Sequence, residues 1–348
     1  MRGQRGRLLL GVVLAALLLA VVFWQVDWDE LRGALRGASI GPLLGLSAVT
    51  VGVYALRAWR LGFLLAPLGR VRFVDLFSAT YVGFAAGLLV PRAQEILRPW
   101  LISRRYPIPL SAGFATIIIE RLVDLITVLV LFALYLFVLP TPPQQTAGAL
   151  MGVVKMAGAA TAVVALVVLG VLLALHSHAD RVLGLLDKIL TRLPDWAAGP
   201  LRRIVRAFSD GLAVLRAPAG HLAAIFAQSF AIWLLIATGF HLNHAAFSLD
   251  LPFHATFLLI AFLTVGVAIP TPGMVGGFHA FYMVTLHQMF GVDQATAAAA
   301  GITAHAFSFL PILLFGLPLL WREGLSLGRV AAVTEEEGSP ASFPEVQS

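Results

Sequence analysis

Apolar segments long enough to cross a bilayer recur along almost the whole of this 348-residue chain. A bilayer core requires about 20 apolar residues in helical form. Hydrophobic residues make up 59% of the sequence and charged residues 12%, a balance that would expose large apolar patches on a soluble domain. The sequence therefore predicts an all-α integral membrane protein, with apolar segments at residues 8–26, 40–56, 73–90, 111–139, 150–175, 219–242, 253–270 and 297–321.

The first apolar segment follows three arginines, Arg2, Arg5 and Arg7, as a signal peptide would. It is longer than the apolar region of a signal peptide, and no small-residue cleavage site precedes Asp27. We therefore interpret it as an uncleaved anchor with the N-terminus in the cytoplasm.

The distribution of arginine argues against eight simple spans. With the N-terminus inside, segment 73–90 would end outside, directly before Arg92, Arg98, Arg104 and Arg105, against the positive-inside rule. We predict instead that residues 73–102 form a re-entrant helical hairpin entered from the cytoplasm. A second hairpin, residues 253–290, would enter from outside, which leaves about six transmembrane helices and both termini in the cytoplasm.

The two hairpins resemble each other in sequence. "VDLFSATYVGFAAGLLVP" (74–91) aligns without gaps with "FHATFLLIAFLTVGVAIP" (253–270), which pairs Gly87 with Gly266 and Pro91 with Pro270. The surrounding units, residues 40–139 and 219–321, would have opposite orientations and so form an inverted repeat, an architecture common in transporters.

The stretch "IPTPGMVGGFHAF" (269–281) cannot be a regular helix, because it contains Pro270, Pro272 and three glycines. Unwound backbone at membrane depth is tolerated where it is buried in protein or lines a wet cavity. The paired breaks, Pro91 in one half and Pro270 with Pro272 in the other, indicate a polar cavity between the hairpins. An ordinary turn between two short helices is the alternative.

Charged residues follow the first break. Arg92, Glu95 and Arg98 recur every three residues, so they share one helix face and could hold a phosphate through arginine forks. Alternatively, this helix lies at the interface and its arginines meet lipid headgroups. The same headgroup-anchoring role is predicted for Arg57 and Arg60, at the cytoplasmic end of the second span, and the alternative is that they form part of the substrate entrance.

Three charged residues interrupt the apolar run "FATIIIERLVDLITVLV". An ionised group at mid-bilayer costs on the order of 2.5–3.5 kcal/mol, so Glu120, Arg121 and Asp124 need partners or a wet pocket. Arg121 can reach Asp124 at i,i+3, which leaves Glu120 to pair with the arginines of the first hairpin. The alternative is an ion cluster that only fixes helix packing.

The second half carries fewer charges. Several groups at its helix break could bind an anion: Thr271, the backbone N–H groups around Gly273 and Gly276, and His279. His279 and His305 could carry a proton, as could Glu120, although a lone membrane histidine is commonly a packing residue.

Several functions lack support in the sequence. The chain has no cysteine, its nine histidines lack metal-ligand spacing, and we find no nucleotide-binding or hydrolase motif, so no metal or cofactor is predicted. The formal net charge of +6 is spread between apolar spans, which favours anionic lipid headgroups over nucleic acid as the partner.

We divide the chain into a membrane domain, residues 1–322, and a short disordered acidic tail, residues 323–348. Residues 176–218 connect the halves on the cytoplasmic side, either as amphipathic helices on the inner leaflet or as a plain connection.

Three motifs together resemble the transmembrane region of lysylphosphatidylglycerol synthases and related stand-alone, flippase-like membrane proteins: "LLVPRAQEILRPWLI", "ATIIIERLVDLITVLVLF" and "AIPTPGMVGGFHAF". The resemblance covers roughly residues 7 to 322. Residues matching the family patterns are Pro91, Glu95, Arg98, Glu120, Arg121, Asp124, Pro270, Pro272, Gly273 and Gly276. Arg92 approximates a basic position, while Gln94 and Met274 replace glycines and His279 lies near an expected glutamate.

The resemblance implies a domain that moves lipids between the leaflets of a prokaryotic cytoplasmic membrane, without the soluble domain that transfers aminoacyl groups in the synthases. We therefore expect a flippase-like transporter of a phospholipid or lipid-linked phosphate rather than an enzyme. The alternatives are a membrane-embedded enzyme with Glu120 or Asp124 as base, or a non-catalytic partner of a lipid-modifying transferase.

Overall fold

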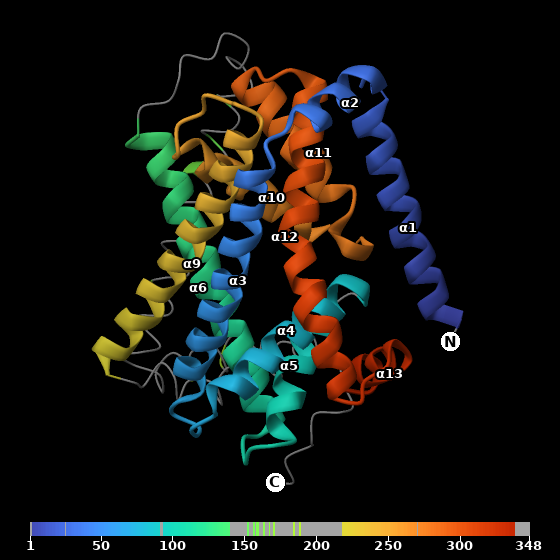
Figure 1. The fold of residues 1–348 in the computed structure, drawn as a ribbon. Coiled ribbons are helices and arrows are strands. Elements are labelled where there is room, and N and C mark those ends of the chain that lie inside the picture. The colour runs from blue at the N-terminus through green and yellow to red at the C-terminus, as the bar shows by residue number, and fades with distance from the viewer. Residues whose placement is uncertain are drawn as a thin grey trace.

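The computed structural model describes residues 2–24, 26–90, 93–139, 218–269 and 271–337, with a few isolated positions between 152 and 188 (Figure 1). Every regular element in these residues is a helix, as predicted. The predicted span 150–175 and connection 176–218 lie almost entirely outside the described residues, as do Pro91, Arg92 and Pro270.

Five long helices form the frame of the molecule: α1 (Arg2–Phe23), α3 (Ile40–Leu65), α6 (Leu110–Phe137), α9 (Ala219–Ala246) and α12 (Gln294–Arg322). By length and composition α3, α9 and α12 can each cross a membrane. Helix α6 has a comparable length but carries Glu120, Arg121 and Asp124 near its middle. The chain is therefore an integral membrane protein.

Two hairpins of short helices lie between the long ones, and both predicted helix breaks are present. The first hairpin consists of α4 (Phe73–Leu89) and α5 (Ala93–Ser103). The second consists of α10 (Ala255–Ala268), the 3-10 turn η1 (Pro272–Met274), α11 (Gly277–Val284) and a π-helical turn (Thr285–Met289). In each hairpin the two helices pack against each other.

The paired glycines serve the same purpose in the two hairpins. A Cβ at Gly87 would lie 3.0 Å from the Cβ of Gln94, and a Cβ at Gly266 would lie 2.8 Å from the carbonyl oxygen of Gly277. Each glycine therefore lets the returning helix approach closely.

The long helices run in two opposite directions. Helices α3 and α9 are antiparallel neighbours: a Cβ on Gly45 would lie 3.2 Å from Leu242, while at their other ends the Phe63 carbonyl lies 2.9 Å from His221 Nε2. In Figure 1, α3 and α12 descend while α6 and α9 ascend. The hairpin α4–α5 lies in the lower half of that view and α10–α11 in the upper half, and η1 contacts α4.

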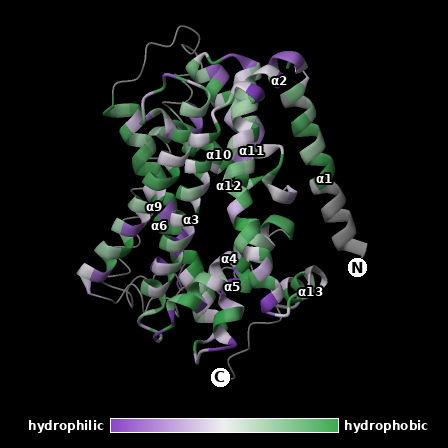
Figure 2. Ribbon diagram, viewed as in Figure 1, coloured by the Kyte–Doolittle hydropathy of each residue, from purple (hydrophilic) through white to green (hydrophobic). Residues whose placement is uncertain are grey.

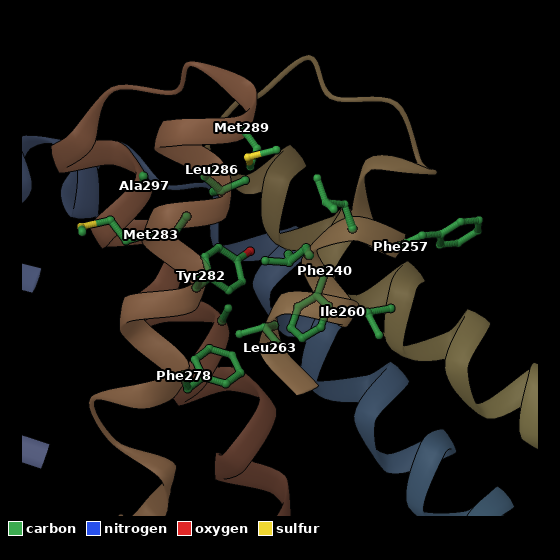
Figure 3. Close-up of a cluster of buried hydrophobic side chains, with 14 of the residues drawn as sticks. Phe240, Phe257, Ile260, Leu263, Phe278, Tyr282, Met283, Leu286, Met289 and Ala297 are labelled. Atoms are coloured by element: carbon green, nitrogen blue, oxygen red, sulfur yellow. The ribbon is translucent and has the colours of Figure 1, made fainter. Parts of the chain in front are cut away.

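A large apolar core joins the second hairpin to its neighbours (Figure 3). Phe240 of α9 faces Ile260 and Leu263 of α10, and Phe278 and Tyr282 of α11 close the cluster. The hydrophobic colour in Figure 2 follows the long helices, while the hydrophilic colour gathers on α2 (Trp28–Gly37) and at the opposite end near α5.

Part of the predicted disordered tail is ordered instead. Residues Leu327–Glu337 form helix α13, which packs against α5 and α4. Its Val330 and Val333 are buried in an apolar cluster with Leu101 and Leu320. These two valines lie one turn apart and form the apolar contact of α13. The prediction of disorder rested on the acidic composition of the tail and did not take them into account. Residues 338–348 lie outside the described residues.

Candidate functional site

Glu120 is the centre of a buried ion cluster. Its carboxylate accepts two parallel hydrogen bonds from Arg98, at 3.0 and 2.8 Å, and one from Arg121 at 2.7 Å. Arg98 comes from α5, which packs along α6 after the first break. The predicted pairing of Glu120 with an arginine of the first hairpin is therefore present in the structure, in the fork geometry that binds a carboxylate most strongly.

Asp124, one turn further along α6, holds a second set of donors. Arg60 donates to both carboxylate oxygens, at 2.6 and 3.2 Å, and Arg57 donates to one of them at 3.2 Å. Ser229 Oγ and Trp233 Nε1 of α9 each donate to the same carboxylate at 3.1 Å. Asp124 therefore ties α3 and α9 to α6.

The prediction that Arg57 and Arg60 anchor headgroups at a span end is wrong. Arg57 is 6% exposed and Arg60 is fully buried. Helix α3 continues to Leu65, so both arginines lie inside the span, on the face that meets α6. The apolar run "LGFLL" directly after Arg60 was the sequence signal for this.

The predicted pair between Arg121 and Asp124 is not among the ion pairs of the described residues, where Arg121 contacts Glu120 instead. The Arg121 side chain is 41% exposed, which makes it the outermost arginine of the cluster. Glu95 is exposed and makes no ion pair within the described residues.

The cluster has more positive than negative charge. Four guanidinium groups, those of Arg57, Arg60, Arg98 and Arg121, surround the carboxylates of Glu120 and Asp124. The formal excess is therefore +2. The Nε atoms of Arg60, Arg98 and Arg121 are buried without a hydrogen-bond partner in the described part of the chain.

A cavity of about 190 Å³ lies beside the cluster, between the two hairpins. Its lining comes from α3, α4, α9, α10, η1, α11 and α12, and includes Leu88 near the tip of the first hairpin and Met274 at the tip of the second. Such a cavity is predicted from the sequence, but with a polar lining. Most of the lining is in fact apolar or aromatic: Tyr54, Phe84, Trp233, Ile236, Phe240, Ile260, Leu263, Val267, Phe278, Phe309 and Ile312.

Arg57 is the one charged residue that lines this cavity in the described part of the chain. Its guanidinium carbon lies 5.6 Å from the ring centroid of Phe84 and 5.8 Å from that of Trp233, within cation–π range. Arg57 thus connects the ion cluster to the cavity.

The predicted polar residues of the second half do not join the ion cluster. Gly273 and Gly276 take positive φ angles of 63° and 89°, which form the turn at the hairpin tip. His305 Nε2 lies 2.8 Å from the Gly273 carbonyl oxygen, and the rings of His279 and His305 are 4.7 Å apart. Thr271 is buried, and its hydroxyl has no hydrogen-bond partner among the described residues.

The turn at the second hairpin tip packs against neighbouring helices. A Cβ on Gly276 would lie 2.9 Å from the carbonyl oxygen of Ala15 in α1. This turn therefore contacts α1 through Gly276 and α12 through the bond between His305 and the Gly273 carbonyl, and its residue Met274 lines the cavity.

The part of the chain that the structure describes contains no group of three or more histidine, aspartate or glutamate side chains placed to hold a metal ion. The arrangement instead offers one guanidinium, aromatic faces and an apolar wall, which suit an amphiphile with a charged end.

Fold and site together define a helical membrane protein in which two broken hairpins meet around a cavity beside buried arginines. The family model of the lysylphosphatidylglycerol synthase transmembrane region matches residues 8–316, and the chain belongs to this family. The match confirms the resemblance found in the three motifs.

A curated relative is the glycosyltransferase AglD of Haloferax volcanii, which is 26% identical over 335 residues. The aligned region covers 87% of this chain and 52% of the relative, so the chain spans about half the relative's length.

Proposed function

We propose that this protein is a flippase-like transporter that moves a phospholipid or a lipid-linked phosphate between membrane leaflets. The observation that carries the proposal is the cavity between the two hairpins, because it places one buried cation, Arg57, against an otherwise apolar and aromatic wall. A charged headgroup would occupy the cavity while its hydrocarbon tails remain in the surrounding lipid.

The helix contacts support an inverted repeat with the cavity near its centre. If α3, α4, α5 and α6 correspond to α9, α10, α11 and α12, each contact in one half has a counterpart in the other. Helix α4 contacts α3 and α12, as α10 contacts α9 and α6; α5 contacts α6, as α11 contacts α12. Repeats of this kind let a transporter open to one side and then the other around a fixed site.

The residues of the site would have different roles in transport. Arg57 faces the headgroup, while Arg60, Arg98, Glu120 and Asp124 hold α3, α5, α6 and α9 around it. Arg121, the outermost arginine of the cluster, would meet the headgroup on its way in.

The proposal also concerns which group could couple transport to protons. Glu120 is engaged by Arg98 and Arg121, so a proton on it would have to displace these bonds. The pair His279 and His305, which touches the Gly273 carbonyl at the hairpin tip, is the better candidate for proton coupling.

The two comparisons support a role in the metabolism of lipids or lipid-linked glycans. One names a lipid-modifying synthase and the other a glycosyltransferase. The second candidate function follows from the same names: this chain would be the membrane partner of a lipid-modifying or glycosyl transferase in a prokaryotic cytoplasmic membrane.

The decisive experiment is leaflet exchange of labelled lipids in liposomes that contain the purified protein, with a variant that fills the cavity. Ile236 lines the cavity, whereas Leu234 on the same helix is 39% exposed. We expect Ile236→Phe to slow exchange at least tenfold and Leu234→Phe to leave it unchanged. Equal rates in both variants would contradict transport through this cavity, and a folded parent protein that exchanges no lipid would favour the partner function.

The orientation can be tested because the chain has no native cysteine. Cysteines at Ser103, the last residue of α5, and at Ser248, after α9, should react from the cytoplasmic and the outer side respectively. Labelling of both from one side would contradict the inverted repeat.

A further inference from the structure

We propose that the cavity selects lipids whose headgroup has a net negative charge and rejects those whose headgroup has a net positive charge, with Arg57 as the residue that contacts the phosphate. This inference rests on the proposed transport function and names the class of lipid that is moved.

Arg57 is the arginine of the cluster that both lines the cavity and retains donors for a ligand. Arg60 and Arg98 each use two guanidinium nitrogens on a carboxylate, at 2.6 and 3.2 Å and at 3.0 and 2.8 Å. Arg57 donates through Nη1 alone within the described residues, to Asp124. Because a guanidinium carries five N–H donors, a phosphate oxygen in the cavity can bind Arg57 without breaking its ion pair.

The charge balance favours an anion in the cavity. The cluster has a formal excess of +2, and its two carboxylates are already bonded to arginines. The lining described above contains no acidic residue. In surroundings of low dielectric an unpaired positive charge is costly, and an anionic group beside Arg57 would reduce that cost.

The same balance disfavours a headgroup with a net positive charge, such as an aminoacylated phosphatidylglycerol. Aromatic rings can bind an ammonium group through their faces, and the cavity is rich in such rings. However, Arg57 already lies within cation–π range of Phe84 and Trp233. An ammonium group in the cavity would therefore lie beside the Arg57 guanidinium, with no free carboxylate between the two positive charges.

The test compares three lipids with the same labelled acyl chain in phosphatidylcholine liposomes that contain the full-length protein. These are phosphatidylglycerol (net negative), phosphatidylcholine (neutral) and lysylphosphatidylglycerol (net positive). We expect phosphatidylglycerol to exchange at least tenfold faster than the lysyl lipid, equivalent to about 1.4 kcal/mol. Equal rates, or a preference for the lysyl lipid, would overturn the inference, whereas no exchange of any lipid would overturn the transport function itself.

A matched pair of variants tests the electrostatic cause without removing Arg57, whose loss could prevent folding. Thr264 of α10 lines the cavity, and its hydroxyl bonds only within its own helix, to the Ile260 carbonyl oxygen at 2.8 Å. Thr264→Glu adds a carboxylate to the cavity, and Thr264→Gln adds the same bulk without charge. We expect Glu to abolish or reverse the preference and Gln to retain it.

The role of Arg57 itself is tested with Arg57→Lys, which keeps the charge but loses the fork. We expect slower exchange of phosphatidylglycerol with the preference retained, and Arg36→Gln, which removes an exposed cation on α2, should change neither. Identical lipid preferences in the Thr264→Glu and Thr264→Gln proteins would refute the electrostatic cause. An unchanged rate in Arg57→Lys would refute phosphate contact through the guanidinium.

Discussion

The substitution Asp124→Asn should destabilise the folded protein severely, although it changes the side-chain shape very little. Asp124 accepts five hydrogen bonds, two from Arg60 and one each from Arg57, Ser229 and Trp233. Asparagine keeps one acceptor oxygen and replaces the other with an NH₂ group, which would face guanidinium donors. The substitution also raises the formal excess of positive charge in the cluster from +2 to +3.

The magnitude follows from burial. Arg60 is fully buried, so water cannot replace the lost carboxylate. Removing one partner of a buried ion pair costs about 3–5 kcal/mol. Since about 1.4 kcal/mol corresponds to a factor of ten, the folding equilibrium should shift by roughly two to four orders of magnitude.

The assay is reversible unfolding of the purified protein in mixed micelles, in which a denaturing detergent is titrated and helicity is followed. We expect a large decrease in the unfolding midpoint for Asp124→Asn. The control is Asp29→Asn, which removes an exposed pair with Arg32 and should change the midpoint little, because exposed ion pairs contribute little to stability.

A double variant separates loss of the ion pair from general damage to the site. If Arg60→Met is combined with Asp124→Asn, the buried cation is removed with its partner, so the double variant should lose much less stability than the sum of the single variants. Additive losses would refute the argument that an unpaired Arg60 is the source of the cost. An unchanged midpoint in Asp124→Asn would refute the buried cluster as a structural element.

Two further predictions concern packing and pH. Gly316→Leu should destabilise the protein by about 1–3 kcal/mol, because a Cβ there would overlap the Cβ of Ala85 in α4. Gly301→Ala on the same helix, where the nearest atom would lie 3.4 Å from the new Cβ, should be tolerated in the same unfolding assay. The pKa of Asp27 is lowered from 3.8 by hydrogen bonds from the backbone N–H groups of Glu30 and Asp29. A lowered pKa stabilises the folded state at pH values above the ordinary pKa of aspartate, and this stabilisation is lost as the pH falls through the lowered pKa. The protection of amides at the start of α2, measured relative to their intrinsic exchange rates, should therefore decrease in acid, and in Asp27→Asn this protection should not depend on pH; protection that does not respond to pH in the parent protein would contradict this.

The features that could be predicted from the sequence are those that depend on local rules. Pro91 ends one apolar run, and Pro270 with Pro272 and the following glycines ends the other, so the breaks of both hairpins were found at the right places. An ionised residue inside an apolar run needs a partner, and this requirement led to the contact between Glu120 and Arg98. In each case the physical rule operates within a short stretch of chain.

The features that were missed depend on which helix faces meet. Arg57 and Arg60 were assigned to the membrane interface because arginine near a span end usually lies there. Their actual partner, Asp124, is more than sixty residues away in sequence, and nothing in either segment specifies that α3 packs on α6. The apolar lining of the cavity was missed for the same reason, because it is assembled from seven separate elements.

The two halves share a backbone plan but differ in chemistry, and this difference bears on the number of sites. In the first hairpin the returning helix is tied to the bundle by ions, through Arg98 and Glu120. In the second it is tied by neutral groups, since the amide of Asn243 donates to the hydroxyl of Tyr282 at 2.9 Å and Thr303 donates to the same amide at 3.0 Å.

Charge is therefore concentrated on one side of the cavity, although helices from both halves form its wall. If each half bound a headgroup, each would need its own cation at the cavity, yet Arg57 is the one that the described residues place there. Under the proposed transport function, this asymmetry would favour a single headgroup site, held by the first half. Transport that saturates with one lipid per protein would agree with this arrangement, and two independent binding events would contradict it.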